Sequence, residues 1–300
     1  MSTFTVPKQK QIRVIVDTDA KCEADDQYAI VHALLTPKFQ IRGLIAAHYG
    51  NLYSDDTMSQ SYQECQKILS FMNMTDQIKV FHGAKKAIEA DNTFEYSEGA
   101  DLIVREALSE NQLPLFVIFQ GAITDLACAY LAHPEIAGKL TAIWIGGGRY
   151  PEGGDEFNLK NDIHAANIIF QSSIELWQVP MNTYCKMQVS LTELEAKVAP
   201  YGDIGAYLFQ QMLEVNEYHS NNPAWPRGES WSLGDSPAIG LMIDPMEVYS
   251  EMREAPLVDE DLHYSFTGSG RKIRVYQDIN SRFILEDFFA KIEKFSKENK

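Results

Sequence analysis

The chain has 300 residues, of which 45% are hydrophobic and 23% charged, and its formal net charge is −16 at pH 7. These fractions are ordinary for a globular protein with a substantial core. The negative charge argues against a nucleic-acid or anionic-membrane partner, because both carry negative charge themselves. No apolar stretch is long enough to span a membrane, and the N-terminal residues MSTFTVPKQKQ lack the apolar core of a signal peptide. We therefore expect a cytoplasmic protein.

The first predicted strand leads directly into a group of acids. Residues 12–16 are rich in β-branched side chains, as in a strand buried on both faces, and an apolar helical pattern begins at Tyr28. Five acids lie between them: Asp17, Asp19, Glu23, Asp25 and Asp26. Several carboxylates in one turn repel one another unless a cation neutralises them, and oxygen-rich shells suit Ca²⁺ or Mg²⁺. A solvated loop with a helix N-cap is the alternative interpretation.

Strands and helices alternate along most of the rest of the chain. Further strands are predicted over 40–47, 78–81, 113–119, 140–145 and 175–179, and helices over 55–72, 99–108, 124–131, 162–170, 203–218, 235–242 and 282–295. A β-hairpin is predicted between 263–266 and 273–276. The pattern predicts one α/β domain over residues 1–300, Rossmann-like, with a mainly parallel central sheet flanked by helices. Residues 221–234 are predicted to form an irregular loop, either a lid over a site or a plug for the core edge.

Polar side chains follow several of the predicted strands. They are Asp17 to Asp26 after the first strand, Asn51 after the second, Gln120 after the fourth, and Glu156 and Asn158 after the fifth. Because the carboxyl ends of parallel strands meet at one edge, these groups can share one pocket with Asp235, which begins a late helix. Each has an ordinary alternative when taken singly, as a helix cap, a turn residue or a surface residue. His82 is the histidine that we expect near this edge.

These motifs, in this order, resemble those of the nucleoside hydrolases, the inosine-uridine type N-ribohydrolases. The resemblance covers roughly residues 12–250. It rests on Asp17-Thr18-Asp19 with Asp25-Asp26, Tyr49-Gly50-Asn51, Gln120 to Asp125, Ile145 to Gly148, Glu156-Phe157-Asn158 and Asp235.

The resemblance implies hydrolysis of the N-glycosidic bond of a ribonucleoside or related small glycoside, with Ca²⁺ as cofactor. By analogy, Asp17, Asp26, Asp235 and the backbone carbonyl of Gln120 would hold the metal. Asp19 would be the general base that takes a proton from the metal-activated water. The ribose hydroxyl groups would contact Asp25, Asn51, Glu156 and Asn158. Family members form dimers or tetramers, so a homodimer or homotetramer is implied as well.

Three departures from the family pattern are visible. The loop between Asp19 and Asp25 has five residues where the family usually has three, and Lys21 in it could lie over the metal. The sugar-binding Asn of the glycine-rich loop is absent, with Gly153 and Gly154 in its region. Gly234 stands where many members have a histidine that is linked to protonating the departing base. We therefore assign contacts with the substrate or leaving group to His82 and Trp225 as well, with Arg227, Glu229 and Trp231 as alternatives.

Two other functions fit parts of the sequence. A Mg²⁺-dependent phosphatase of the DxD type also begins with a strand and paired acids, but it has no use for the second acid pair or for Glu156 and Asn158. A catalytically degenerate protein that binds a metal and a sugar would match the scaffold and would explain Gly234.

Overall fold

The computed structural model describes residues 4–51, 54–90 and 92–298. It is built around an eight-stranded sheet with the strand order β3-β2-β1-β4-β5-β6-β12-β9. All neighbours pair in parallel except β12 and β9, which are antiparallel. Its first six strands therefore follow the 3-2-1-4-5-6 order of a doubly wound fold. The predicted α/β, Rossmann-like architecture is confirmed.

The strands of the main sheet are β1 (Ile12–Thr18), β2 (Phe39–Ala46), β3 (Val80–His82), β4 (Leu115–Phe119), β5 (Thr141–Ile145), β6 (Glu175–Val179), β9 (Ser250–Glu254) and β12 (Lys272–Tyr276). Two small antiparallel sheets consist of β7 (Gln188–Ser190) with β8 (Ser230–Ser232), and β10 (Leu257–Val258) with β11 (Tyr264–Ser265).

The α-helices are α1 (Asp26–Leu34), α2 (Thr57–Phe71), α3 (Glu98–Ala107), α4 (Thr124–Ala132), α5 (Phe157–Asn161), α6 (Ile163–Gln171), α7 (Met181–Tyr184), α8 (Leu191–Lys197), α9 (Gly202–Tyr218), α10 (Ser236–Ile243) and α11 (Ser281–Glu298). Short 3-10 turns cover Lys8–Lys10, Pro134–Ile136 and Glu247–Tyr249. None of the described helices has the length and apolar character needed to cross a membrane.

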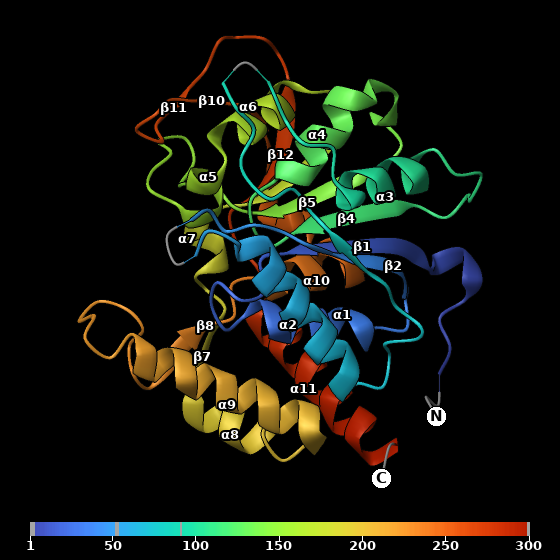
Figure 1. Cartoon of the computed structure of the whole chain (residues 1–300), viewed down its shortest axis with the longest axis vertical. Coiled ribbons are helices and arrows are strands. Elements are labelled where there is room, and N and C mark those ends of the chain that lie inside the picture. The colour runs from blue at the N-terminus through green and yellow to red at the C-terminus, as the bar shows by residue number, and fades with distance from the viewer. Residues whose placement is uncertain (1–3, 52–53, 91, 299–300) are drawn as a thin grey trace.

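Strand β1 lies near the middle of the sheet and is buried along its whole length. Its alternating side chains enter two separate cores, with Val14 and Val16 on one face and Ile15 on the other. Helices α1, α2, α10 and α11 cover the first face, and α3, α4 and α6 cover the second (Figure 1). Burial on both faces explains why β1 is a nearly continuous apolar run.

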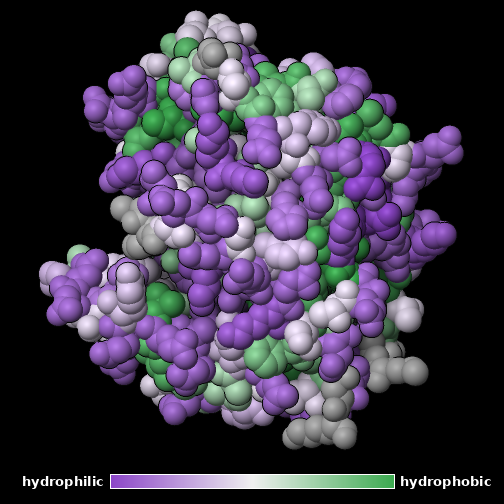
Figure 2. Space-filling view, viewed as in Figure 1, coloured by the Kyte–Doolittle hydropathy of each residue, from purple (hydrophilic) through white to green (hydrophobic). Residues whose placement is uncertain are grey.

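The outer surface is mostly hydrophilic on the face shown in Figure 2, with hydrophobic side chains in small separate patches. Helices α8 and α9 lie on the α1 side of the sheet, beyond the helices that pack directly on it (Figure 1). Scattered small patches are normal for a soluble surface and need no partner to explain them.

Two parts of the predicted secondary structure are wrong. The hairpin expected between 263–266 and 273–276 does not form, because β11 pairs with β10 while β12 enters the main sheet between β6 and β9. Ile273 and Val275 on β12 are buried there, and this burial in the central core outweighs the local turn. The segment 221–234 is irregular only in part, since residues 230–232 form β8.

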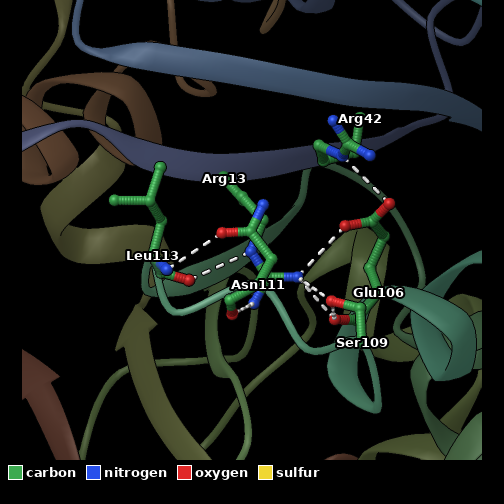
Figure 3. Close-up of polar contacts among 6 residues, drawn as sticks. All are labelled: Arg13, Arg42, Glu106, Ser109, Asn111 and Leu113. Carbon is green, nitrogen blue, oxygen red and sulfur yellow. Dashed lines mark hydrogen bonds and ion pairs between the residues drawn. The ribbon is translucent and has the colours of Figure 1, made fainter. Parts of the chain in front are cut away.

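A buried arginine ties the start of β1 to the chain between α3 and β4. Arg13 donates from Nε to the Leu113 carbonyl (3.0 Å) and from Nη1 to Ser109 Oγ (2.8 Å) and to a carboxylate oxygen of Glu106 (3.1 Å), as Figure 3 shows. Glu106 also pairs with Arg42 at 2.9 Å, but Arg42 is far more exposed. The guanidinium therefore fixes the turn that leads into the central strand β4.

We expect Arg13→Met to lower the free energy of unfolding by about 3 kcal/mol, because it leaves buried carbonyl and carboxylate groups without their donor. Urea denaturation followed by circular dichroism measures the change. The matched variant Arg42→Met removes an exposed partner of the same carboxylate and should cost less than about 1 kcal/mol. Equal losses in the two variants would contradict this account.

Candidate active site

From β1 the chain adds β2 and β3 on one side, and it then adds β4, β5 and β6 on the other. A pocket lies at the carboxyl ends of the strands where this switch occurs. In open α/β sheets this crevice is where ligands bind. The pocket has a volume of about 60 Å³. Six carboxylate side chains line it, and no Lys, Arg or His is among the described lining residues. They are Asp19, Glu23, Asp25, Asp26, Glu156 and Asp235.

The loop after β1 carries three of these acids, with Asp26 following at the start of α1, and it is held by side-chain amides. Gln27 donates from Nε2 to the Ala20 carbonyl, and Gln211 on α9 donates from Nε2 to the Ala24 carbonyl at 2.8 Å. Lys21 does not lie over the acids: its Nζ is 3.7 Å from Glu64 on α2. Lys21 is therefore directed toward α2 and the Ala24 carbonyl toward α9, while Glu23 lines the pocket.

Position 121, which packs against the Asp19 side chain, requires glycine. A Cβ atom on Gly121, in the turn after β4, would lie 2.8 Å from Asp19 Cγ, so a larger residue would displace that carboxylate. Asp19 is buried, and its Oδ2 atom has no hydrogen-bond partner in the described part of the chain. An unpartnered buried carboxylate oxygen is unfavourable and marks a place where a ligand is expected.

Asp235 completes the acid cluster from a distant segment. It immediately precedes α10, which packs against α1, and this packing brings it to Asp25 and Asp26. One carboxylate oxygen from each of the three residues lies within 4.8 Å of the others. Asp25, which was predicted as a sugar ligand, is therefore a member of this cluster together with Asp26.

The electrostatics of the pocket show how crowded these charges are. Burial raises the pKa of Asp25 to about 6, and burial together with the neighbouring Asp25 raises the pKa of Asp26 to about 7. The pKa values of Asp19, Glu23 and Asp235 rise well above their ordinary values, chiefly through burial and then through the surrounding carboxylates. A hard divalent cation would relieve this repulsion, so the residues present fit such an ion.

Asp17 is not brought into the cluster. It is fully buried at the end of β1, and its carboxyl group faces Asp125 of α4 rather than the pocket. Burial and the charge of Asp125 raise the pKa of Asp17 well above its ordinary value. Gln120 does line the pocket, and its backbone carbonyl accepts a hydrogen bond from Asn158 Nδ2 at 3.1 Å.

Glu156 and Asn158 lie on the opposite wall at the start of α5. Glu156 caps this helix by accepting hydrogen bonds from the backbone N–H groups of Asn158 and Leu159. Asn158 Nδ2 also donates to the Ile145 carbonyl at the end of β5. Both residues line the pocket, so the predicted sugar ligands Asp25, Glu156 and Asn158 meet in one place.

Three other predicted ligands lie outside this lining. Asn51 lines a neighbouring pocket of about 650 Å³, which shares Phe157 with the acid pocket. His82 is exposed, pairs with Glu98 at 3.2 Å and stacks on Tyr62. Trp225 packs against Trp231 and His219.

Several lining residues received no role from the sequence. They are Cys22, Glu23, Ile145, Phe157 and Tyr184. Tyr184 follows the end of β6, and polar residues after that strand would have been the signal to examine, since β6 ends at the same edge of the sheet.

Comparison with known proteins gives consistent matches. The family model described as inosine-uridine preferring nucleoside hydrolase matches residues 14–285. The pyrimidine-specific ribonucleoside hydrolase RihA of Escherichia coli O1:K1 is 29% identical over 238 residues, covering 71% of this chain and 72% of the relative. RihA of Salmonella paratyphi A is 26% identical over 249 residues, with 75% of each chain covered.

Two solved structures share the fold. The purine-preferring ribonucleoside hydrolase from Gardnerella vaginalis has a TM-score of 0.79 at 18% identity, covering 95% of this chain and 99% of that one. The inosine-uridine preferring nucleoside hydrolase from Bacillus anthracis has a TM-score of 0.67 at 16% identity, covering 96% and 100%.

We expect excess Ca²⁺ to raise the melting temperature relative to protein in chelator, and to do so more at pH 8 than at pH 5. The raised pKa values mean that the folded protein binds extra protons from about pH 4 to about pH 7. In chelator, the acids therefore destabilise the fold progressively as the pH rises through this range. The cation replaces those protons, so its contribution grows with pH.

Asp235→Asn is the variant that tests this expectation. It should raise the melting temperature in chelator at pH 8, because one crowded charge is removed, and it should reduce the gain from Ca²⁺. Asp278→Asn is the matched control, since Asp278 is an exposed partner of Lys186. A gain from Ca²⁺ that survives in Asp235→Asn would show that the ion binds elsewhere.

Proposed function

Because this chain belongs to the inosine-uridine preferring nucleoside hydrolase family, we propose that it hydrolyses ribonucleosides with Ca²⁺ as cofactor and Asp19 as general base. Membership makes the chain an N-ribohydrolase that acts on the N-glycosidic bond of a small nucleoside substrate. The observation that carries the finer proposal is the set of six carboxylates in one pocket at the switch point of the sheet. The phosphatase alternative gains no support from the comparisons.

The cation would be held by carboxylates of the cluster. We assign Asp26 and Asp235 as ligands, together with the Gln120 carbonyl, which keeps one lone pair beside its bond from Asn158. Ca²⁺ accepts such a mixture of carboxylate and carbonyl oxygens more readily than Mg²⁺, which retains most of its waters. When bound, the ion would acidify a water molecule and offset the negative charge of the pocket. We assign Asp17 a supporting role behind Asp19, since its carboxyl group faces Asp125.

Asp19 has the properties of a proton acceptor at the reacting centre. Its Oδ2 atom is buried and has no hydrogen-bond partner among the described residues, and the missing side chain at Gly121 leaves the space that this carboxylate occupies. Asp25, Glu156 and Asn158 would orient the sugar from the other walls. Cleavage of an N-glycosidic bond develops positive charge on the sugar, and the surrounding carboxylates stabilise that charge.

Release of reducing sugar from a panel of purine and pyrimidine ribonucleosides, with Ca²⁺ present, tests the proposed activity directly. A cytoplasmic location and a homodimeric or homotetrameric assembly stay predictions from the sequence. Absence of sugar release from every ribonucleoside at neutral pH would overturn the proposal.

We expect Asp19→Asn to lower kcat by about 10²- to 10⁴-fold, the usual contribution of a general base, since the amide cannot accept the proton. Binding of the ribonucleoside, measured by calorimetry, should change far less, because the size and packing of the side chain are kept. Asp101→Asn, at an exposed position that pairs with Arg105, is the control and should retain full activity. Unchanged kcat in Asp19→Asn would assign the base to another carboxylate.

A further inference from the structure

Tyr184 lines the acid pocket, but neither the sequence motifs nor the proposed mechanism gives it a role. It ends α7, the short helix after β6, and lines the same pocket as Asp19 and Asp235. Its backbone is held on two sides. Its N–H donates to the Pro180 carbonyl at 3.1 Å, and its carbonyl accepts from the Met187 N–H at 3.0 Å. Thr183, the residue before it, donates from Oγ1 to the Tyr276 carbonyl at 2.8 Å.

The ring of Tyr184 occupies space that Gly234 leaves open. A Cβ atom on Gly234 would lie 3.1 Å from Tyr184 Cδ2 and 3.3 Å from Asp25 Oδ2. Both distances are tighter than ordinary van der Waals contact, so a side chain at position 234 would press on the ring and on the carboxylate. The position of the Tyr184 ring therefore depends on the absence of a side chain at Gly234.

The hydroxyl group of Tyr184 points at Glu156 and donates to its Oε1 atom at 2.9 Å. Glu156 accepts three further hydrogen bonds, from the N–H groups of Gly147 (2.7 Å), Leu159 (2.8 Å) and Asn158 (3.2 Å). A carboxylate offers about four acceptor positions, so this group is already saturated by the protein. The phenol has used its single hydrogen, but its oxygen still has a lone pair with which to accept.

We propose that Tyr184 contacts the pentose directly by accepting a hydrogen bond from one sugar hydroxyl, and that Glu156 is the positioning residue that aims the phenol. This inference rests on the proposed function and names the part of the substrate that the pocket recognises. Glu156, predicted as a ribose ligand, would then act on the sugar through Tyr184. Selectivity for a pentoside that keeps this hydroxyl, over the matching deoxy compound, then comes from Tyr184.

The test compares the unaltered protein with Tyr184→Phe, with Ca²⁺ present, on one ribonucleoside and its 2′-, 3′- and 5′-deoxy forms. The unaltered protein should disfavour the deoxy form that lacks the contacted hydroxyl by about tenfold in kcat/KM, as one hydrogen bond allows. Tyr184→Phe should lose about tenfold on the ribonucleoside but nothing further on that one deoxy form. Its selectivity against the other two should be unchanged.

The same comparison on equilibrium binding separates this inference from the proposed function. Methyl β-ribofuranoside and its deoxy forms serve as ligands in calorimetry, which needs no turnover. If no ribonucleoside is hydrolysed but Tyr184→Phe still removes selectivity for one hydroxyl in binding, then the hydrolase proposal fails and the assignment of Tyr184 holds.

A purely structural role for Tyr184 would give a different result. Tyr184→Phe would then weaken all four compounds by one common factor, or none of them, and either result would overturn the proposal. Tyr276→Phe is the matched control, because this buried tyrosine donates its hydroxyl to the Pro245 carbonyl and does not line the pocket. It should leave every selectivity ratio as it is in the unaltered protein.

Discussion

Crowding of buried carboxylates at the end of β1 is the constraint on which the rest of this structure depends. Six carboxylates, of which all but Glu23 are buried, share a small pocket whose described lining includes no basic side chain, which is unfavourable in isolation. The fold tolerates the arrangement because the segments that carry these acids are held from outside the pocket. Gln27 and Gln211 hold the loop after β1, and packing of α10 on α1 holds Asp235. A bound cation would relieve the cost of this crowding.

The doubly wound sheet explains how acids more than 200 positions apart in sequence come together. Asp19 and Asp26 follow β1, Glu156 follows β5, and Asp235 precedes a helix that packs on α1. Parallel strands direct their carboxyl ends to one edge, so side chains that follow different strands converge there without being neighbours in sequence. The buried Arg13 works at the opposite end, where it fixes the entry into β4 and so the register of the strand next to β1.

The sequence predicted the sheet well where local pattern decides the structure. The apolar runs at β1, β4 and β5 are buried on both faces, and their composition shows it. It failed where a distant partner decides, as for β12, which joins β6 and β9 instead of forming a local hairpin. The same limit applies to the pocket. Glu23 was visible as an acid, but its direction depends on how the loop packs against α9. Tyr184 can line the pocket only because Gly234, fifty positions later in the sequence, has no side chain.

Under the proposed function, a nucleoside would be divided between two neighbouring pockets of different size. The acid pocket, at about 60 Å³, is far smaller than the roughly 300 Å³ or more of a typical small-molecule site, so it can enclose an ion and part of a sugar but not a base. The adjoining space of about 650 Å³ shares Phe157 with it and includes Asn51. The scissile bond would then lie beside Phe157, which lines both pockets. Asn51, predicted as a ribose ligand, would then lie on the side of the departing base, and Tyr184 and the acids on the side of the sugar. That division accounts for an acid pocket built from carboxylates and a larger pocket whose lining includes Lys85, Lys86 and Lys160. Positive charge develops on the sugar and negative charge on the base that leaves it.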